Sequence, residues 1–578
     1  MTNAEIAAAL DELGVLYELD GAVRYRVLAY GTAAKAIRES PVSVAELAAK
    51  GEATKVPGVG KTLAEKIDAL LETGEIPAAV KLKAKFPPTL IEVTRVPGVG
   101  TKTARRLFEE LDVCSMEDLK AAAEAEKVRQ VKGLGPKQEE NILAALERLG
   151  EPGEGPGRLL LSKVKPIAEE LAAALREHPA ANQVEVAGSV RRWAETCKDI
   201  DLIATADEPA GLAEHLAGHP LIAAAGNPSE NGVHAQTHNG VSVDLRIVAP
   251  AKFGNLLQHF TGSKAHNVQL REEAVARGLS VSEHGITEKS ESGDTTTTCA
   301  TEAEVYERLG YAYVEPELRE GRGELKAARE GKLPQLVEQG DLKGDLHSHT
   351  TLSDGRNSLE EMAEAARDRG YEYLAITDHS ASHGFGDHVT AERLWERIEE
   401  VRVWNKDYGK KDFRLLAGSE INIGLDGSLD YPDDLVAALD WVVASVHTSF
   451  SVSEAQMTER VLTAIENPSV DCIGHLTGRL IGRREPYGID VEKVAEAAAR
   501  TGTMIEINGN PNRRDLSDLH ARLAAEAGVK IVLNTDAHGV DTLDNIAYAV
   551  ATARRAWLTP DDVANTRGWT AFKKLLES

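Results

Sequence analysis

The chain has 578 residues, a formal net charge of −26 at pH 7, and 42% hydrophobic against 4% aromatic residues. At roughly 100 to 200 residues per domain, this length predicts several domains with packed cores. Its four cysteines lie far apart without a CxxC pair, which argues against a disulfide framework or a thiolate zinc cluster. There is no apolar run of about 18 residues, and the start, MTNAEIAAALDELG, carries acids where a secretory leader needs basic and then apolar residues. We therefore expect a cytoplasmic protein that does not cross a membrane.

The acidity of the chain is unevenly distributed. Residues 1–150 hold 21 Lys and Arg against 23 Asp and Glu, so almost all of the excess acid lies beyond residue 150. Phosphate contacts depend on the local field within a Debye length of roughly 8 to 10 Å. The net charge of the whole chain therefore does not exclude a nucleic-acid partner for the first part.

Changes of pattern along the chain indicate its domain organisation. Residues 1–150 are rich in Ala, Leu, Glu and Lys with helical periodicity, and the Gly/Pro-rich EPGEGPGR at 151–158 ends this block. Strand-like segments with intervening helices follow at about 184–250, and from 343 onward short apolar strands alternate with helical stretches. We place domains at 1–80, 81–155, 156–258, 259–318 and 343–578, with a charged linker at 319–342.

Three near-repeats in the first block each open a helix with a Gly-x-Gly turn. They are KVPGVGKTLAEKIDALL (55–71), RVPGVGTKTARRLFEEL (95–111) and VKGLGPKQEENILAAL (131–146). Glycine lets the backbone approach a ligand closely, and free N–H groups at a helix start bind anions. One such turn is often only a turn, but three with adjacent Lys or Arg predict helix-hairpin-helix motifs that hold the DNA backbone. The turn glycines are Gly58, Gly60, Gly98, Gly100, Gly133 and Gly135.

Three acidic residues are spaced to share one face of two strands. In DIDLIAT the carboxylates of Asp199 and Asp201 alternate, so on a strand both point to one side, and the strand-like VSVDLRIV adds Asp244. Such acids can hold two divalent ions about 3.5 to 4 Å apart, an arrangement that stabilises phosphoryl transfer. A DxD pair alone is often a solvated surface pair. Here donors for a triphosphate precede it: Gly188, Ser189 and Arg192.

The motifs GSVRR-x6-DID, VDLR and HFTGSKAHN resemble the nucleotidyltransferase palm and thumb of family X DNA polymerases, the polymerase beta type, and KVPGVGKTLAEKID resembles that family's N-terminal hairpin. The resemblance implies that Asp199, Asp201 and Asp244 bind two Mg2+ or Mn2+ ions, with Asp244 activating the primer 3′-hydroxyl. It also implies contacts to the triphosphate by Gly188, Ser189 and Arg192, to sugar and base by His259, Phe260, Gly262 and Asn267, and to the template by Arg271.

The chain departs from that family at two positions. His259 replaces the usual tyrosine of the sugar-contacting pair, which predicts weaker exclusion of ribonucleotides, and Trp193 replaces a small glycine beside the triphosphate. The family's first hairpin can also carry a 5′-deoxyribose phosphate lyase, and Lys66 matches its Schiff-base lysine. A helix lysine that contacts phosphate or solvent is the alternative for Lys66.

Beyond residue 340, His, Asp and Glu residues stand at or just past the ends of successive apolar strands. On a parallel barrel this is the face where sites are assembled, so residues almost 200 apart in sequence can converge. Imidazoles with carboxylates and without cysteine suit Zn, Mn or Fe. The nine residues are His347, His349, Asp354, His379, Glu420, His447, His475, Asp536 and His538.

This set resembles the PHP (polymerase and histidinol phosphatase) family, whose domains are distorted (βα)7 barrels with a trinuclear site. The resemblance implies up to three Zn2+, Mn2+ or Fe2+ ions that lower the pKa of a water, so that hydroxide attacks phosphorus. By motif order it implies His347, His349, Glu420 and Asp536 on one ion, Glu420, His447 and His475 on a second, and Asp354, His379 and His538 on a third.

The two resemblances together cover essentially the whole chain, and their combination resembles the bacterial and archaeal PolX family and implies its multidomain fold. It comprises an 8-kDa-like helix-hairpin-helix domain (1–80), fingers with further hairpins (81–155), an α+β nucleotidyltransferase palm (156–258), a thumb (259–318) and a PHP barrel (343–578). We expect a gap-filling repair DNA polymerase with a 3′-5′ exonuclease, and AP-endonuclease action as a related possibility. Its partners would be gapped or primer-template DNA and dNTPs, as a nucleoid-associated monomer. The alternatives are a small-molecule phosphatase with a DNA-docking N-terminal half, and a non-catalytic DNA-binding protein.

Overall fold

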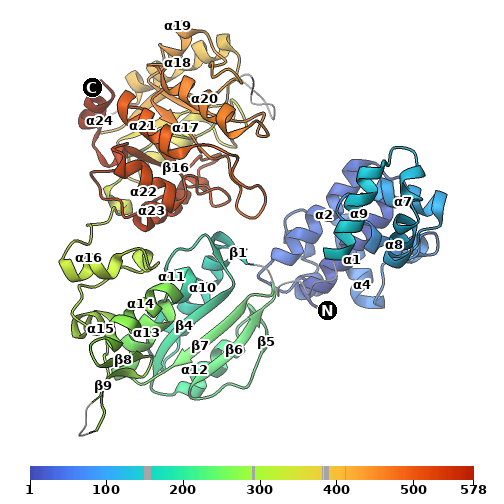
Figure 1. The fold of residues 1–578 in the computed structure, drawn as a ribbon, viewed down its shortest axis with the longest axis horizontal. Coiled ribbons are helices and arrows are strands. Elements are labelled where there is room, and N and C mark those ends of the chain that lie inside the picture. Colours follow the sequence, from blue (N-terminus) through green and yellow to red (C-terminus); the bar gives the residue numbers. More distant parts are fainter. Residues whose placement is uncertain (149–157, 290–292, 381, 383–388, 410–411, 578) are drawn as a thin grey trace. The chain divides into compact units, whose positions relative to one another are not determined.

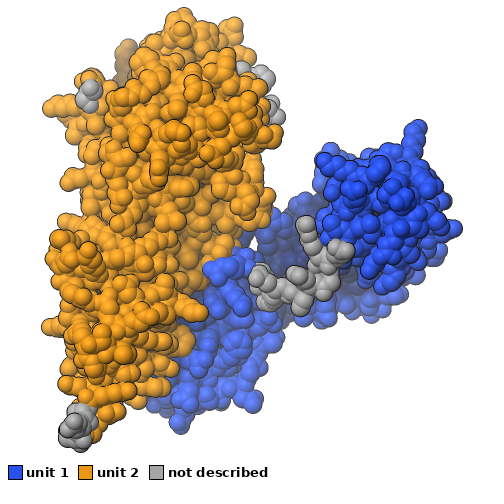
Figure 2. Space-filling view, in the orientation of Figure 1, with its two compact units in different colours: residues 1–159, 163–186, 198–249 blue, residues 160–162, 187–197, 250–578 orange. Residues whose placement is uncertain are grey.

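The computed structural model describes residues 1–148, 158–289, 293–380, 382, 389–409 and 412–577. Two compact units make up the chain, the first of residues 1–159, 163–186 and 198–249 and the second of residues 160–162, 187–197 and 250–578 (Figure 2). The Gly/Pro-rich segment expected to end the first block lies, apart from Arg158, outside the described residues. Among the helices in these ranges, none combines the length and the apolar character that crossing a membrane requires.

The N-terminal part of the first unit is built from short helices around one apolar core. Thr2 and Glu5 form a capping box at the first helix, and Leu10, Leu13 and Ile37 are fully buried between helices. The helices are α1 (Asn3–Leu19), α2 (Arg24–Glu39), α3 (Val44–Ala49), α4 (Lys61–Thr73), α5 (Pro77–Lys83), α6 (Thr89–Val93), α7 (Thr101–Leu111), α8 (Met116–Glu124) and α9 (Pro136–Arg148) (Figure 1).

A five-stranded sheet forms the rest of the first unit, together with α12 (Pro209–Ala217) and most of α10 (Leu161–Glu177). Its order is β2-β4-β7-β6-β5, in which β4 and β7 are parallel and the remaining neighbours antiparallel. The strands are β2 (Ala181–Val186), β4 (Asp199–Ala206), β5 (Ile222–Ala225), β6 (Gly232–Thr237) and β7 (Ser242–Ile247). Along the first half of β4 and along β7, buried apolar residues alternate with more exposed polar ones, so the acids lie on one face of the sheet and buried apolar residues on the other.

The second unit begins with helices and a small antiparallel sheet around the buried residues Val305, Tyr306 and Leu325. Its elements are α11 (Gly188–Arg191), α13 (Phe253–Thr261), α14 (Lys264–Val275), β8 (Leu279–Ser282), β9 (Gly285–Glu288), β10 (Thr295–Thr297), α15 (Glu302–Arg308) and α16 (Glu324–Glu330).

The segment at 319–342, expected to be a charged linker, carries helix α16 and is partly buried. Arg319 is fully buried, donates to Glu302 at 2.6 Å and lies over the rings of Tyr306 and Tyr313 at 5.2 and 5.4 Å. Because each buried charge is paired, the segment packs although its composition is polar.

Seven parallel strands form the barrel of the second unit, in the order β11 to β17. A parallel bridge between Ser348 and Ala537 joins the segments after its first and last strands. The strands are β11 (Gly344–Asp345), β12 (Tyr373–Ile376), β13 (Arg414–Asn422), β14 (Trp441–Ser445), β15 (Cys472–Ile473), β16 (Met504–Asn508) and β17 (Ile531–Asn534). Outer helices include α17 (Leu359–Asp368), α18 (Ala391–Asp407), α20 (Glu454–Ile465), α21 (Val491–Thr501), α22 (Asp518–Glu526) and α23 (Ile546–Arg555).

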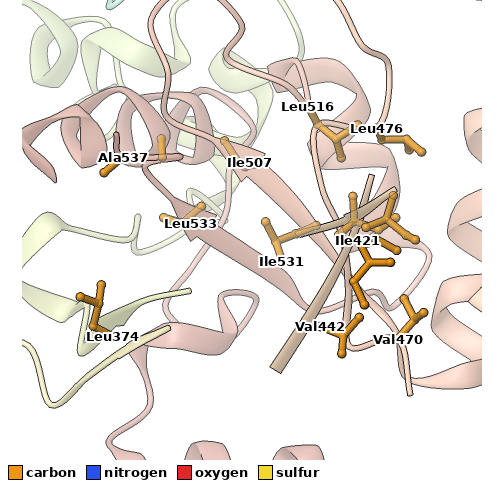
Figure 3. Packing of buried hydrophobic residues seen from close by; sticks show 14 of the residues in the cluster. Leu374, Ile421, Val442, Val470, Leu476, Ile507, Leu516, Ile531, Leu533 and Ala537 are labelled. Atoms are coloured by element: carbon orange, nitrogen blue, oxygen red, sulfur yellow. The ribbon is translucent and has the colours of Figure 1, made fainter. Parts of the chain in front are cut away.

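Alternation along the strands gives the barrel two cores. In β12, Leu374 belongs to the core shared with the outer helices, whereas Tyr373 belongs to a second, inner core. Phe572 of helix α24 (Trp569–Leu576) stacks on Tyr373 with ring centroids 5.0 Å apart. Residues of the outer core are drawn in Figure 3, among them Leu374, Val442, Ile507 and Leu533. With its body filled by apolar side chains, the barrel presents its polar residues at the strand ends.

Candidate functional site

The ends of the barrel strands bring the nine predicted metal ligands together. Glu420, near the end of β13, is at the centre of the cluster. Its Oε1 lies 2.8 Å from His475 Nε2 and 3.2 Å from His447 Nε2. Its Oε2 lies 2.9 Å from His379 Nδ1 and 3.3 Å from His347 Nε2. These side chains come from five segments of the barrel, and Glu420 itself is buried. With His349 Nε2 at 3.7 Å from Oε2, one carboxylate faces five imidazoles.

The remaining predicted ligands extend this cluster. His349 Nε2 lies 3.2 Å from Asp536 Oδ1, and His538 Nε2 lies 3.3 Å from Asp354 Oδ2. Ligand atoms fall within 4.8 Å of one another in three groups, which are His347 with His349 and Asp536, His349 with Asp354, His379 and His538, and His379 with Glu420 and His447. His349 and His379 each belong to two groups, so the assignment of ligands to individual ions by motif order stays a prediction.

The donor set fits divalent metal ions. Both carboxylate oxygens of Glu420 and both ring nitrogens of His349 are buried, and within the described part of the chain they lack a hydrogen bond of ordinary geometry. A buried polar atom without a partner is costly, whereas a metal ion satisfies such atoms together. Six imidazoles and three carboxylates at this density match the ligands that Zn, Mn and Fe prefer.

Electrostatics keep several of these imidazoles in the neutral form that binds metal. Burial, with the nearby rings of His538 and His379, lowers the pKa of His349 to about 3. Burial also lowers the pKa of His447 to about 4, although Glu420 opposes this. Neutral imidazole has a free lone pair, so these two rings are prepared for ligation at neutral pH.

Nearby carboxylates raise the pKa of another imidazole of the cluster, that of His347. For His347, burial opposes the positive charge, but Glu506, Glu420 and Asp536 outweigh it and hold its pKa well above the ordinary value. Positive charge is thus strongly favoured at this point, and either a proton or a metal ion can supply it.

Glu506, on β16, orients the cluster and was not predicted from the sequence. Its Oε1 lies 2.7 Å from His347 Nδ1 and accepts from Asn534 Nδ2 at 3.0 Å, while Oε2 accepts from the His475 backbone N–H at 2.9 Å and from Asn508 Nδ2 at 3.2 Å. With Nδ1 bound to a carboxylate, His347 directs Nε2 toward the ligand cluster. The only sequence signal was an acid inside the apolar strand MIEIN, which implies a buried partner.

In the first unit, strand pairing places the predicted palm acids side by side. The parallel register of β4 and β7 sets Asp201 opposite Asp244 and Asp199 opposite Ser242. All three acids are partly exposed on the same sheet face, between buried Ile200, Leu202, Val243 and Leu245. The expected face is therefore formed, and Asp244 also pairs with Arg246 Nη2 at 3.0 Å.

In the second unit, several residues expected to bind the nucleotide contact one another. Arg192 donates from Nη1 to the Thr261 carbonyl at 2.5 Å and from Nε to Glu320 at 3.2 Å. Gly262 follows at φ 64°, where a Cβ would lie 3.3 Å from the Arg192 guanidinium. Ser189 Oγ is buried without a hydrogen-bond partner in the described segments.

The predicted sugar and template contacts form a second group there. Asn267 Nδ2 donates to the His259 carbonyl at 2.7 Å, and Arg271 Nη2 lies 2.9 Å from His259 Nδ1. Burial lowers the pKa of His259. The ring of Phe260 lies 5.4 Å from that of His259. The imidazole that replaces tyrosine is thus fixed by the arginine expected to contact the template.

The three predicted hairpin turns have the backbone that their glycines allow. Gly58, Gly98 and Gly133 adopt φ of 80°, 88° and 85°. Gly60 and Gly100 are the N-caps of α4 and α7, whereas the Gly135 N–H donates to Gln138 at 3.1 Å. Lys66 lies half-buried on α4, and its lyase role stays a prediction.

Family models match four parts of the chain. A helix-hairpin-helix domain matches residues 1–76, a SAM-like helix-hairpin-helix tandem 90–148, a DNA polymerase beta thumb 256–320 and a PHP domain 345–510. Together with the parallel seven-stranded barrel, these matches confirm the predicted fold class.

Three relatives cover the chain to different extents. The DNA polymerase/3′-5′ exonuclease PolX of Bacillus subtilis (strain 168) is 38% identical over 569 residues, 98% of each chain. DNA polymerase lambda of Rattus norvegicus is 26% identical over 359 residues, 55% of this chain and 56% of its own. A probable phosphatase of Thermoanaerobacter sp. (strain X514) is 34% identical over 238 residues, 38% of this chain and 89% of its own.

Proposed function

This chain belongs to the PolX family, and from that membership we propose that it is a DNA polymerase whose PHP domain is a 3′-5′ exonuclease. The observation that carries this proposal is the 38% identity, over 98% of each chain, to a DNA polymerase/3′-5′ exonuclease. Two separate groups of residues, the acids of β4 and β7 and the cluster at the barrel strand ends, support it. We further propose that it fills gaps during DNA repair, because hairpins that hold backbone phosphates suit short gapped duplexes.

For nucleotide incorporation, the palm acids hold the reacting groups. We assign Asp199, Asp201 and Asp244 to two Mg2+ or Mn2+ ions, because the register of β4 and β7 places them on one face. Divalent ions supply Lewis acidity and neutralise the charge that develops on the phosphate oxygens. We assign to Asp244 the role of the base that takes the proton of the primer 3′-hydroxyl.

The loop before β4 binds the triphosphate of the incoming dNTP in this proposal. The N–H groups of the Gly188 turn and the Ser189 hydroxyl donate to phosphate oxygens, and Arg192 adds positive charge. The Arg192 contacts to Thr261 and Glu320 use Nη1 and Nε, so we assign Nη2 as the donor to a phosphate. His259 and Phe260 meet the sugar.

For degradation, the PHP cluster positions water and the 3′-terminal phosphodiester. We assign up to three Zn2+, Mn2+ or Fe2+ ions to the nine ligands, because ligand atoms of this set gather within 4.8 Å of one another in three groups. Glu506 keeps His347 Nε2 directed at the cluster. Arg513, with Nε 3.8 Å from Asp536 Oδ2, places a cation beside the ligands where an anionic substrate must bind.

Separate substitutions test the two assignments. Asp201→Asn should abolish incorporation of dNTPs into gapped DNA while 3′-end degradation continues, and His347→Ala should do the reverse. Asp207→Asn, at an exposed acid just after β4, is the matched control for the palm. Incorporation that survives Asp201→Asn, with the control unchanged, would refute the palm assignment.

A phosphatase is the second candidate for the PHP domain. It is favoured by the 34% identity to a probable phosphatase over 38% of this chain. Assays on a 3′-hydroxyl end, a 3′-phosphate end, an AP site and a small phosphomonoester separate the candidates. Release of nucleotides from the 3′-hydroxyl end supports the exonuclease, whereas activity only on phosphomonoesters supports the phosphatase.

A further inference from the structure

The nucleotide loop, defined here as residues 188–195, is held by the PHP barrel, which lies in the same compact unit. Arg514, in the segment after β16, donates from Nη1 to the Trp193 carbonyl at 2.9 Å. Arg555, at the end of α23, donates from Nη1 to the Arg192 carbonyl at 2.8 Å. Two successive carbonyls of the loop are therefore fixed by guanidinium groups of the barrel.

A third arginine binds the end of the nucleotide loop. Arg479, in the segment after β15, lies 2.6 Å from Glu195 Oε1 and 3.3 Å from Glu195 Oε2, a bidentate ion pair. Its Nη2 also donates to the Arg514 carbonyl, and Arg514 Nε donates to Thr552 Oγ1 at 3.0 Å. The three contacts thus belong to one connected network.

The barrel also reaches the side chain expected to bind the triphosphate. Glu320 Oε1 accepts from Arg192 Nε at 3.2 Å and from Arg555 Nη1 at 2.8 Å. These groups are mostly shielded from solvent, since the side chains of Arg192 and Glu320 are 14% and 18% exposed. Arg555 therefore fixes both the backbone and, through Glu320, the guanidinium of Arg192.

Backbone strain in the nucleotide loop indicates that these contacts hold its conformation. Trp193 adopts φ 53°, a left-handed conformation that is strained for a residue with a side chain. Its ring lies 5.8 Å from Tyr548 of α23, edge to face, while Arg514 holds its carbonyl. Such a conformation persists only where the surroundings hold it.

We propose that Arg514, Arg555 and Arg479 are positioning residues for nucleotide incorporation, so that the PHP barrel shapes the loop that binds the dNTP triphosphate. This inference rests on the proposed polymerase function of the chain. The same segment serves the other site, because Arg513 points to the ligand Asp536 while Arg514 holds the loop. The barrel is thus a structural part of the polymerase as well as the site of degradation.

Steady-state kinetics on gapped DNA test this proposal with the full-length chain. The variants are Arg514→Lys and Arg479→Met on the barrel, Glu195→Gln on the loop, and Arg500→Met as a control, because Arg500 forms an exposed pair with Glu466 on the barrel surface. We expect Arg514→Lys to raise KM for dNTP about tenfold, the fold-change of one lost charge-assisted hydrogen bond. We expect kcat and degradation of the same DNA without dNTPs to stay within about twofold.

A double-mutant cycle isolates the Arg479–Glu195 pair. Each single substitution should raise KM, and the double variant should be no worse than the more affected single variant, because both remove one ion pair. Glu195→Gln decides the question if a barrel variant does not fold, since Glu195 lies at the surface with 31% of its side chain exposed.

Three results would overturn the proposal. The positioning role is refuted, and the polymerase function is not, if the wild type extends primers and KM for dNTP is unchanged in Arg514→Lys, Arg479→Met and Glu195→Gln. Degradation and extension that fall together with the melting temperature show a merely structural role. A wild-type chain that incorporates no nucleotide refutes the proposed polymerase function, and the inference with it.

Discussion

Replacing Glu506 by glutamine should weaken metal binding at the PHP cluster without disturbing the palm. Four donors converge on this buried carboxylate: His347 Nδ1 at 2.7 Å, Asn534 Nδ2 at 3.0 Å, the His475 N–H at 2.9 Å and Asn508 Nδ2 at 3.2 Å. Only an ionised carboxylate accepts on both oxygens, and the pKa of Glu506 is lowered because His347 outweighs the effect of burial.

The expected loss of metal affinity follows from the amide group of the glutamine. Its NH2 group must face two of the four donors, so either His347 Nδ1 loses its acceptor or the His475 N–H does. Removing a carboxylate that orients a ligating histidine typically costs about 10- to 100-fold in metal affinity, or about 1.4 to 2.7 kcal/mol. We expect a similar fall in degradation at limiting metal and little change at saturating metal.

Metal titration by calorimetry and release of 3′-terminal nucleotides provide the readouts. Glu526→Gln, at an exposed acid on the surface of the barrel that pairs with Arg522, serves as the control. Primer extension should be unaffected in both variants. Wild-type metal affinity in Glu506→Gln, with its melting temperature retained, would refute the reasoning, because it would mean that Glu506 does not orient His347.

Three further predictions concern the thumb, the first hairpin and the sugar contact. Burial opposes the charge of Glu302, but Arg319 lowers the pKa of this carboxyl below 4.5. The pair therefore stabilises the fold above pH 4.5, and this stabilisation is lost as the pH falls through the lowered pKa. The melting temperature of Glu302→Gln should fall less than that of the wild type at acid pH, and identical pH profiles of the two would exclude the pair as the source. Lys66→Ala should abolish borohydride trapping on a 5′-deoxyribose phosphate end, and undiminished trapping would clear this lysine. His259→Tyr should increase discrimination against rNTPs in kcat/KM, whereas an unchanged ratio would assign the selection to Phe260 or the backbone.

Features that depend on local pattern were predictable from the sequence. The turns at Gly58, Gly98 and Gly133 follow from a glycine before an amphipathic helix, and their positive φ values are as expected. The shared face of Asp201 and Asp244 follows from strand alternation, although the parallel register itself is set by the whole sheet.

Single contacts between residues far apart in sequence, outside the ligand cluster, were not predictable. The segment at 319–342 reads as a linker because it is charged, yet Glu324 is buried against His266 at 2.7 Å, and composition does not reveal such pairs. Likewise Arg514 and Trp193 are 321 residues apart, so no local pattern could connect the PHP barrel with the nucleotide loop. Glu506 was missed for the same reason, since its partner His347 is 159 residues away.

The central claim is that one chain carries two independent phosphoryl-transfer sites that build and shorten the same primer end. The direct measurement follows one 5′-labelled primer on gapped DNA, with dNTPs, for the wild type, Asp201→Asn and His347→Ala. The account predicts longer and shorter products for the wild type, only shorter ones for Asp201→Asn and only longer ones for His347→Ala. Loss of both product classes in either folded variant would contradict it.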